Sequence, residues 1–333
     1  MKVLVSGTAG GAGWPEPGCG CASCAGLPSG HRRPFEVVVD DAVRFPLAEP
    51  PDGYHACAGG LGLACPDGSR LLYLPAGRSV PVDGPGRYDV VLIDLLDRPE
   101  RLGELRRAGL ADDATLVVAA GLDHRIRSEE ELARRLRLWG AVAVPDGTEL
   151  WAGTAQETSV DRPRRALLLG GSRSGKSAEA ESRLAAEPYV TYVATGPGGA
   201  GDGEWAARVR AHKERRPAHW DTIETTDLAR TMRTAEAPLL IDGLGTWLAA
   251  VFDEHGAWDG DRAPVAARCD GLVAAWRATP QRIVAVSDEV GMGVVPATAS
   301  GRAFRDALGR LNERLAAESE YVALVVAGRL LEL

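Results

Sequence analysis

The stretch Gly170-Gly171-Ser172-Arg173-Ser174-Gly175-Lys176-Ser177 decides the fold class of the second half of the chain. It has the spacing G-x-x-x-x-G-K-[ST], follows the apolar run 166–169 and precedes a helical pattern. In such a loop the backbone N–H groups converge on phosphate oxygens, the lysine reaches the β- and γ-phosphates, and the serine hydroxyl binds Mg²⁺. A glycine-rich turn that only joins a strand to a helix is the alternative, but the match over the whole motif favours a phosphate site.

The sequence around this loop alternates between apolar strands and helices. We predict strands over residues 165–169, 189–194, 238–241, 282–286 and 321–327, and helices over residues 176–186, 203–216 and 303–317. Continuous apolar strands separated by helices indicate a mostly parallel sheet that is covered on both faces. The predicted fold class is therefore α/β, with a P-loop NTPase-type sheet flanked by helices over residues 165–333.

Asp242 follows the strand 238–241 and is the candidate partner of Ser177 at Mg²⁺. In P-loop proteins a carboxylate at the end of a strand beside the phosphate loop helps to hold the metal. Strands also end in aspartate because this residue forms turns, so the prediction depends on the phosphate loop.

The composition excludes several kinds of partner. A net charge of -8 offers no domain-scale positive surface that could displace counterions from nucleic-acid phosphates. No apolar run approaches the ~20 residues that a membrane span needs, and we expect a cytoplasmic protein. Anionic ligands must then be bound by local donors. Of 38 basic residues only Lys2, Lys176 and Lys213 are lysines, so the lysine in the phosphate loop is notable.

Several motifs of the second half occur in the order found in a known enzyme family. They are Gly170–Ser177, Tyr192-Val-Ala-Thr-Gly196, Ala207-Arg-Val-Arg-Ala-His-Lys-Glu-Arg-Arg-Pro-Ala-His-Trp220, Ser287-Asp-Glu-Val-Gly-Met-Gly-Val-Val-Pro296, Arg302-Ala-Phe-Arg-Asp306 with Gly309 and Asn312, and Val325-Val-Ala-Gly328. Together they resemble the bifunctional adenosylcobinamide kinase/adenosylcobinamide-phosphate guanylyltransferase over residues 165–333. The resemblance implies ATP, GTP and Mg²⁺ as ligands, adenosylcobinamide and its phosphate as substrates, and a homotrimer.

The same resemblance implies two reactions and a nucleophile, His212. The aminopropanol hydroxyl of adenosylcobinamide is phosphorylated, and GMP then passes from GTP through a histidine to that phosphate, giving adenosylcobinamide-GDP. A nucleophilic imidazole must be neutral, and cations around it, such as Arg208 and Arg210, lower its pKa. From the residues alone, a histidine on an arginine-rich helix is more often part of a solvated face. His219 is the less favoured nucleophile.

The resemblance further implies a set of nucleotide-binding residues. They are Gly170, Gly171, Ser172, Arg173, Ser174, Gly175, Lys176, Ser177, Thr195, Gly196, Lys213, Glu214, Arg215, Arg216, Glu224 and Asp242. Two departures from the family pattern lie close to them. Gly243-Leu-Gly245 replaces the usual Cys/Ser-Thr character after the carboxylate, and Asp288 replaces an asparagine. Asp288 adds negative charge near the expected phosphates, so we expect it to weaken one activity.

Residues 1–152 form a predicted first domain, which the polar linker 153–164 joins to the second. We predict strands over residues 36–39, 70–74, 89–95 and 114–119 and a helix over residues 128–139. The stretch from Ser6 to Cys24 resembles the opening of metallo-β-lactamase-fold phosphodiesterases that carry a structural zinc. The His-x-His-x-Asp-His motif of active enzymes is missing, and residues 1–150 contain only His31, His55 and His124. This implies a shortened relative that has lost hydrolysis.

Cys19, Cys21 and Cys24 are candidate ligands of a structural Zn²⁺, with His124 as the fourth. Thiolates and imidazole suit tetrahedral zinc, and close cysteine spacing in a chain of cytosolic character favours a metal over a disulfide. The alternative is a set of small buried thiols in a glycine-rich turn.

Three functions remain open at this point. The leading one is a bifunctional kinase and guanylyltransferase, the second is a guanylyltransferase alone, and the third is a GTP-binding regulator whose first domain recruits a partner. A nucleophile at position 212 separates them, because a regulator has no need for one.

Overall fold

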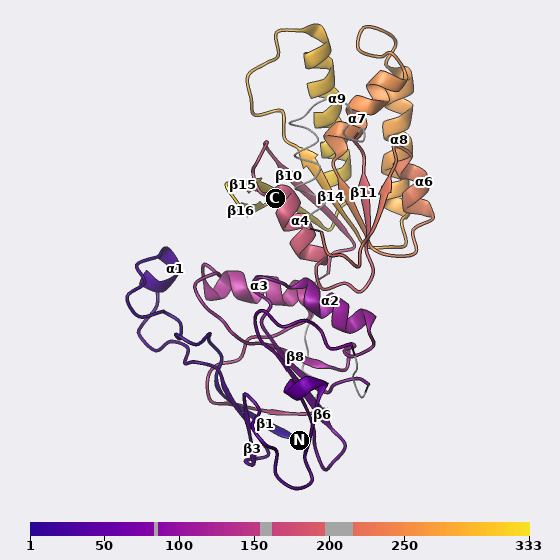
Figure 1. Cartoon of the computed structure of the whole chain (residues 1–333). Coiled ribbons are helices and arrows are strands. Elements are labelled where there is room, and N and C mark those ends of the chain that lie inside the picture. Colours follow the sequence, from indigo (N-terminus) through magenta and orange to yellow (C-terminus); the bar gives the residue numbers. More distant parts are fainter. Residues whose placement is uncertain (83–85, 154–161, 197–215) are drawn as a thin grey trace. The chain divides into compact units, whose positions relative to one another are not determined.

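In the computed structural model the described residues are 1–82, 86–153, 162–196 and 216–333. The chain divides into two compact units, Met1–Asp161 with Ala185–Pro188, and Arg162–Leu184 with Tyr189–Leu333 (Figure 1). Over the described part of the chain, no helix combines the length and apolar character that crossing a bilayer requires.

A seven-stranded sheet forms the centre of the second unit, in the order β12-β11-β13-β14-β10-β15-β16. Its strands are β10 (Arg165–Gly170), β11 (Thr191–Ala194), β12 (Asp221–Glu224), β13 (Leu239–Asp242), β14 (Ile283–Asp288), β15 (Tyr321–Val326) and β16 (Arg329–Glu332). All neighbouring pairs are parallel except β15 and β16, which confirms the predicted mostly parallel sheet. The strand predicted over residues 321–327 is found as β15, but β16, which follows it, was not predicted. Ala327 and Gly328 have φ of 49° and 70° and turn the chain back into β16.

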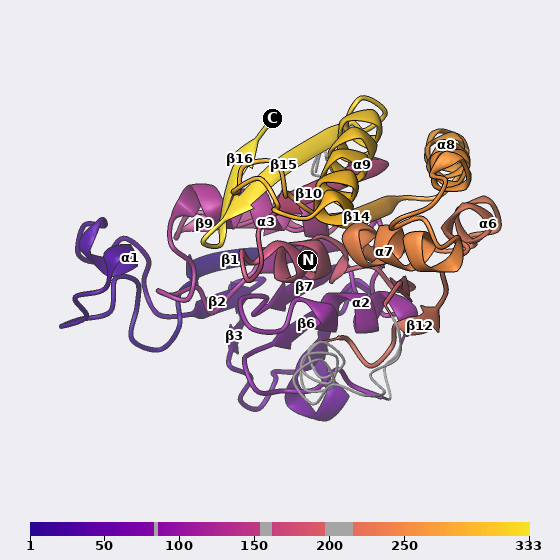
Figure 2. The same cartoon turned by 90° about the horizontal axis from the view of Figure 1, so that it is seen from above.

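Helices cover both faces of this sheet. They are α4 (Lys176–Leu184), α6 (Leu228–Arg233), α7 (Leu244–Glu254), α8 (Ala263–Ala278) and α9 (Ala299–Ala316). Leu167 on β10 packs in one cluster with α6, α7, α8 and α9, whereas its neighbour Leu168 packs with α4 on the other face (Figures 1 and 2). The sheet is therefore buried on both sides, which explains its uninterrupted apolar strands.

Helix boundaries differ from the predictions by a few residues. Helix α4 ends at Leu184 rather than at residue 186. Helix α9 begins at Ala299 rather than at residue 303, because the Thr298 side chain accepts a hydrogen bond from the Gly301 N–H and caps it. The predicted helix 203–216 lies outside the described residues except for its last residue.

The first unit contains two sheets, β3-β2-β1-β9 and β4-β5-β6-β7-β8. The strands are β1 (Lys2–Gly7), β2 (Glu36–Val39), β3 (Val43–Phe45), β4 (His55–Cys57), β5 (Gly62–Ala64), β6 (Arg70–Leu74), β7 (Val90–Ile93), β8 (Leu116–Ala119) and β9 (Thr148–Trp151), and the helices are α1 (Ala22–Ala25), the 3₁₀ helix η1 (Ala58–Gly60), α2 (Glu100–Arg107) and α3 (Glu129–Trp139). The strands predicted over 36–39 and 70–74 are confirmed. The predicted helix 128–139 is confirmed as α3, with Ser128 as its N-cap.

Two hydrophobic clusters build this unit in layers. Val5 and Leu92 belong to a cluster that takes side chains from both sheets. The neighbouring Val91 faces the opposite side of the larger sheet, where it packs with Leu102 of α2 and Leu136 of α3. Successive side chains along β7 therefore point to opposite faces of the sheet and pack alternately into the two clusters.

Candidate active site

The second unit gathers its polar residues at one edge of the sheet. Gly170 at the end of β10 lies opposite Asp288 of β14, and Asp242 of β13 lies opposite Ala194 of β11. Because these strands are parallel, their carboxyl ends meet at the same edge, which is where open α/β sheets bind ligands. Glu224 joins them, since it pairs in register with Ala194 from the end of β12.

The phosphate loop connects β10 to α4, as predicted. Gly175 has a φ of 99°, which side chains rarely allow, and a Cβ there would lie 3.2 Å from the Cα of Gly328. The Gly328 N–H donates to the Ser174 carbonyl at 2.7 Å, so the turn between β15 and β16 braces the loop. The Ser174 hydroxyl is buried and has no hydrogen-bond partner within the structure described. A buried hydroxyl of this kind is available to an incoming phosphate oxygen.

Lys176 is held inside the loop and is only 8% exposed. Its ammonium donates to the Gly171 carbonyl at 3.0 Å and pairs with Asp288 Oδ1 at 3.0 Å. A compact ammonium in this position can reach phosphates bound by the loop, which fits the predicted role.

Asp242 lies beside Ser177, as expected for a metal site. The Ser177 hydroxyl is 3.3 Å from Asp242 Oδ1. A carboxylate and a hydroxyl are hard oxygen donors of the kind that Mg²⁺ prefers, so the residues fit this ion. Tyr192 donates to the other carboxylate oxygen, Oδ2, at 2.7 Å. Burial, with the neighbouring Asp242 charge added, raises the pKa of Tyr192, so the phenol keeps its proton and remains a donor.

Gly245 and Asp288, the two departures from the family pattern, meet in space. A Cβ on Gly245 would lie 2.5 Å from Asp288 Oδ2. The carboxylate therefore occupies the volume that a side chain at position 245 would fill. The two positions were unrelated in the sequence, and only the approach of α7 to the end of β14 brings them together.

Thr195 lies at the same edge, directly after β11, and Arg216 lies against Tyr192 of that strand. The Thr195 hydroxyl, in a residue that is 2% exposed, lies 2.6 Å from the Gly243 carbonyl and 2.7 Å from the Thr246 hydroxyl, so it fastens β11 to the start of α7. Arg216 stacks over the ring of Tyr192 with its guanidinium carbon 3.3 Å from the ring centroid. The predicted residues His212, Lys213, Glu214 and Arg215 lie outside the described residues.

A strand, a phosphate loop and a helix, with a carboxylate at the end of β13 that reaches the loop serine, define the second unit as a P-loop nucleotide-binding domain. Residues 166–333 match a protein-family model described as "Cobinamide kinase / cobinamide phosphate guanyltransferase", and the chain belongs to this family. This confirms the resemblance inferred from the motifs. The family match begins at Ala166, so the relationship of the first unit to metallo-β-lactamase-fold phosphodiesterases stays a prediction.

Bacterial relatives agree with the family match. The chain is 41% identical over 174 residues to "Bifunctional adenosylcobalamin biosynthesis protein CobU" of Salmonella typhimurium, which covers 49% of this chain and 95% of that relative. It is 44% identical over 172 residues to "Bifunctional adenosylcobalamin biosynthesis protein CobP" of Pseudomonas aeruginosa, which covers 49% of this chain and 94% of that relative.

The predicted cysteine cluster comes together in the first unit. The ligand atoms of Cys19, Cys21, Cys24 and His124 all lie within 4.8 Å of one another. His124 Nδ1 is 3.5 Å from Cys19 Sγ, 3.7 Å from Cys24 Sγ, and also 3.2 Å from a carboxylate oxygen of Glu16. Three sulfurs and one ring nitrogen at this spacing fit tetrahedral Zn²⁺.

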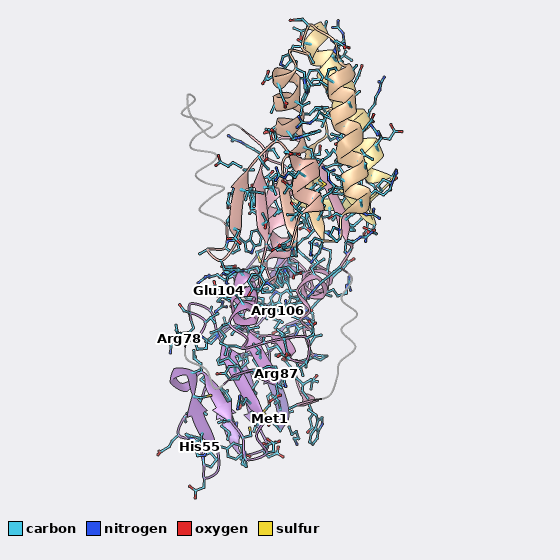
Figure 3. All side chains as sticks on the ribbon, turned by 90° about the vertical axis from the view of Figure 1, so that its right-hand side faces the viewer. Met1, His55, Arg78, Arg87, Glu104 and Arg106 are labelled. Carbon is cyan, nitrogen blue, oxygen red and sulfur yellow. The ribbon has the colours of Figure 1, made fainter. Side chains whose placement is uncertain are left out.

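A buried hydrogen-bond chain positions the two halves of this cluster. Ser23 on α1 accepts from Trp14 Nε1 at 3.1 Å and donates to the Ile126 carbonyl at 2.7 Å. It thereby ties the cysteine turn to the segment that carries His124. The other histidines of the unit have separate surroundings: His31 pairs with Glu129 at 2.8 Å, and His55 is exposed on β4 (Figure 3).

Replacing Asp288 by asparagine should strengthen nucleotide binding. The carboxylate competes with phosphate oxygens for Lys176 and repels them, and its side chain is 43% exposed, which screens the effect. We expect KM for the nucleoside triphosphate to fall about fivefold, which corresponds to about 1 kcal/mol. Steady-state kinetics with varied ATP or GTP measure this change.

Glu289→Gln is the matched control for this substitution, because Glu289 is the adjacent carboxylate and accepts a hydrogen bond from the Gly291 N–H instead. It should leave KM unchanged. A raised KM in Asp288→Asn would show that the carboxylate orients the ammonium productively rather than competing with phosphate.

Proposed function

We propose that residues 165–333 catalyse both reactions of the family, the phosphorylation of adenosylcobinamide and the guanylylation of its phosphate. The observation that carries this proposal is the contact of Ser177 with Asp242 at the phosphate loop that also holds Lys176, inside the region of the family match. A kinase needs this arrangement, because its catalysis consists mainly of positioning and charge stabilisation.

In the kinase step the loop binds the nucleoside triphosphate through its backbone N–H groups, and Lys176 binds the β- and γ-phosphates. The aminopropanol hydroxyl oxygen forms a bond to the γ-phosphorus, the bond between this phosphorus and the β-phosphate oxygen breaks, and the hydroxyl proton passes to solvent. Mg²⁺, when bound by Ser177 and Asp242, neutralises charge on the phosphates.

In the guanylyl step a ring nitrogen of His212 forms a bond to the α-phosphorus of GTP, and pyrophosphate leaves. The proton on the other ring nitrogen departs in this step. A phosphate oxygen of adenosylcobinamide phosphate then bonds to the same phosphorus, the P–N bond breaks, and the imidazole regains its proton. Splitting one displacement into two in this way is covalent catalysis.

Two labels test the proposal on the full chain. With γ-labelled ATP or GTP and adenosylcobinamide, we expect labelled adenosylcobinamide phosphate. With α-labelled GTP, we expect acid-labile label on the protein that adenosylcobinamide phosphate removes as adenosylcobinamide-GDP. Label from GTP without phosphoryl transfer would leave a guanylyltransferase alone, and binding of GTP without either label would favour the regulator.

The first unit is proposed to hold one structural Zn²⁺ at Cys19, Cys21, Cys24 and His124, supported by the spacing of these ligands. A structural zinc stabilises the fold without catalysing a reaction. We also infer a cytoplasmic location, as expected from the sequence, and, from the family resemblance, a homotrimer.

Metal analysis of the purified chain should give about one zinc per chain, and Cys24→Ser should reduce it to near zero, because a four-ligand structural site needs all four donors. Loss of the metal should also lower the unfolding temperature. Cys57→Ser is the control, since Cys57 lies in the same unit and contacts Tyr88 rather than the cluster. Wild-type protein without zinc, or equal zinc in both variants, would rule the site out.

A further inference from the structure

The side chain of Tyr192 stands between two groups of the proposed active site. On one side its hydroxyl donates to Asp242 Oδ2 at 2.7 Å, while Oδ1 of the same carboxylate faces Ser177 at 3.3 Å. On the other side the guanidinium of Arg216 stacks on the ring, with its carbon atom 3.3 Å from the ring centroid. Arg216 directly follows the segment His212–Arg215, which the family resemblance assigns to guanylyl transfer.

The position of this phenol is tightly defined. Tyr192 lies on β11 between β12 and β13, pairs in register with Leu240 and is 2% exposed. It packs in the cluster on the α4 face of the sheet, together with Leu168, Leu184 and Val286. A buried tyrosine normally keeps its hydroxyl paired, and here the partner is a carboxylate at the metal site.

We propose that Tyr192 is a positioning residue that orients Asp242 for the metal through its hydroxyl and holds the guanidinium of Arg216 in place through its ring. The inference rests on the proposed function. Hydrogen bonds to a metal-binding carboxylate fix its orientation, and loss of such a partner costs 10–100-fold in metal affinity, as an order of magnitude. Stacking of arginine on an aromatic ring is a separate, weaker attraction.

Tyr192 would thus contribute to the proposed active site in two ways, through its hydroxyl and through its ring. The hydroxyl acts on Asp242, which would hold the metal in both reactions. The ring acts on Arg216, which lies four residues after the proposed nucleophile in sequence. The two contributions can be separated, because phenylalanine keeps the ring and loses only the hydroxyl, whereas leucine loses both.

Mn²⁺ titration of the full chain with GTP, followed by electron paramagnetic resonance, measures metal affinity independently of turnover. Tyr192→Phe should weaken Mn²⁺ binding by about tenfold and leave GTP-dependent labelling of the protein near the wild-type level at saturating metal. Tyr192→Leu should show the same loss of metal affinity and, in addition, slower labelling at saturating metal. A tyrosine with only a structural role would not shift metal affinity in the phenylalanine variant.

Tyr321→Phe is the matched control, because the ring of Tyr321 also carries an arginine, Arg183, at 3.9 Å, but lies at the start of β15. It should change neither quantity. Wild-type metal affinity in Tyr192→Phe would overturn the hydroxyl's role, and equal labelling rates in the two Tyr192 variants would overturn the ring's role. If the wild type catalyses neither reaction, the Mn²⁺ titration still decides the first part, so the failures are distinguishable.

Discussion

Replacing Lys176 by alanine is expected to lower phosphoryl transfer to adenosylcobinamide by about 10²–10³-fold in kcat, as removal of one preorganised charge donor typically does. Lys176 is 8% exposed, and its ammonium is held between the Gly171 carbonyl and Asp288. Without it, charge that develops on the transferred group loses its partner, and Asp288 faces the phosphates uncompensated. Initial rates with γ-labelled ATP measure the loss.

Two further lysine variants test whether the loss is specific to the compact ammonium at position 176. Lys176→Arg keeps the charge but replaces a compact ammonium by a wide planar fork, so we expect only a small recovery. Lys2→Ala is the control, since Lys2 pairs with Asp41 at 3.1 Å and Glu149 at 3.2 Å in the first unit. Phosphoryl transfer by Lys176→Ala at more than half of the wild-type rate would refute the assigned role of the loop.

His212→Ala is expected to abolish the acid-labile label that α-labelled GTP leaves on the protein. A phosphoramidate needs the imidazole nitrogen, and alanine offers no replacement nucleophile. Phosphorylation of adenosylcobinamide should continue in this variant, because the phosphate loop and the Ser177–Asp242 pair are unchanged. Autoradiography after denaturation, with acid and base treatment of the labelled protein, measures the linkage.

His219→Ala serves as its control, because His219 is the alternative nucleophile in the same stretch of sequence. Label that persists in His212→Ala and disappears in His219→Ala would move the nucleophile to position 219. Label in both variants would show that neither histidine accepts GMP.

Much of the second unit could be predicted from local patterns. The motif 170–177, with an apolar strand before it, identified the phosphate loop, since its spacing is a property of consecutive residues. Asp242 could be placed beside Ser177 because a carboxylate that follows a parallel strand reaches the same edge as the loop. The cluster of Cys19, Cys21 and Cys24 was equally visible, and the structure places the predicted fourth ligand, His124, 3.5 Å from Cys19 Sγ.

Other contacts of the site gave no local signal. In the sequence, Tyr192 cannot be told from the other residues of a predicted buried strand. Only the pairing of β11 with the neighbouring strand β13 brings Asp242 to its hydroxyl. The ending Val325-Val-Ala-Gly328 could be recognised as a motif, but its contact with Ser174 could not, because Ser174 and Gly328 are 154 positions apart along the chain. The closing strand β16 was missed because the turn at Ala327 requires a positive φ without the usual Asn-Gly pair.

The amino-acid sequence by itself determined the class of chemistry. The phosphate loop, the order of strands and helices and the family motifs depend on residues close together in the chain, and backbone geometry turns each of them into the same local structure. The tertiary structure decided which distant groups act on one another, namely Tyr192 with Asp242, Asp288 with Lys176 and Gly245, and Gly328 with the loop. Strand order and register set these contacts, and they arise from packing of the whole sheet rather than from any single segment.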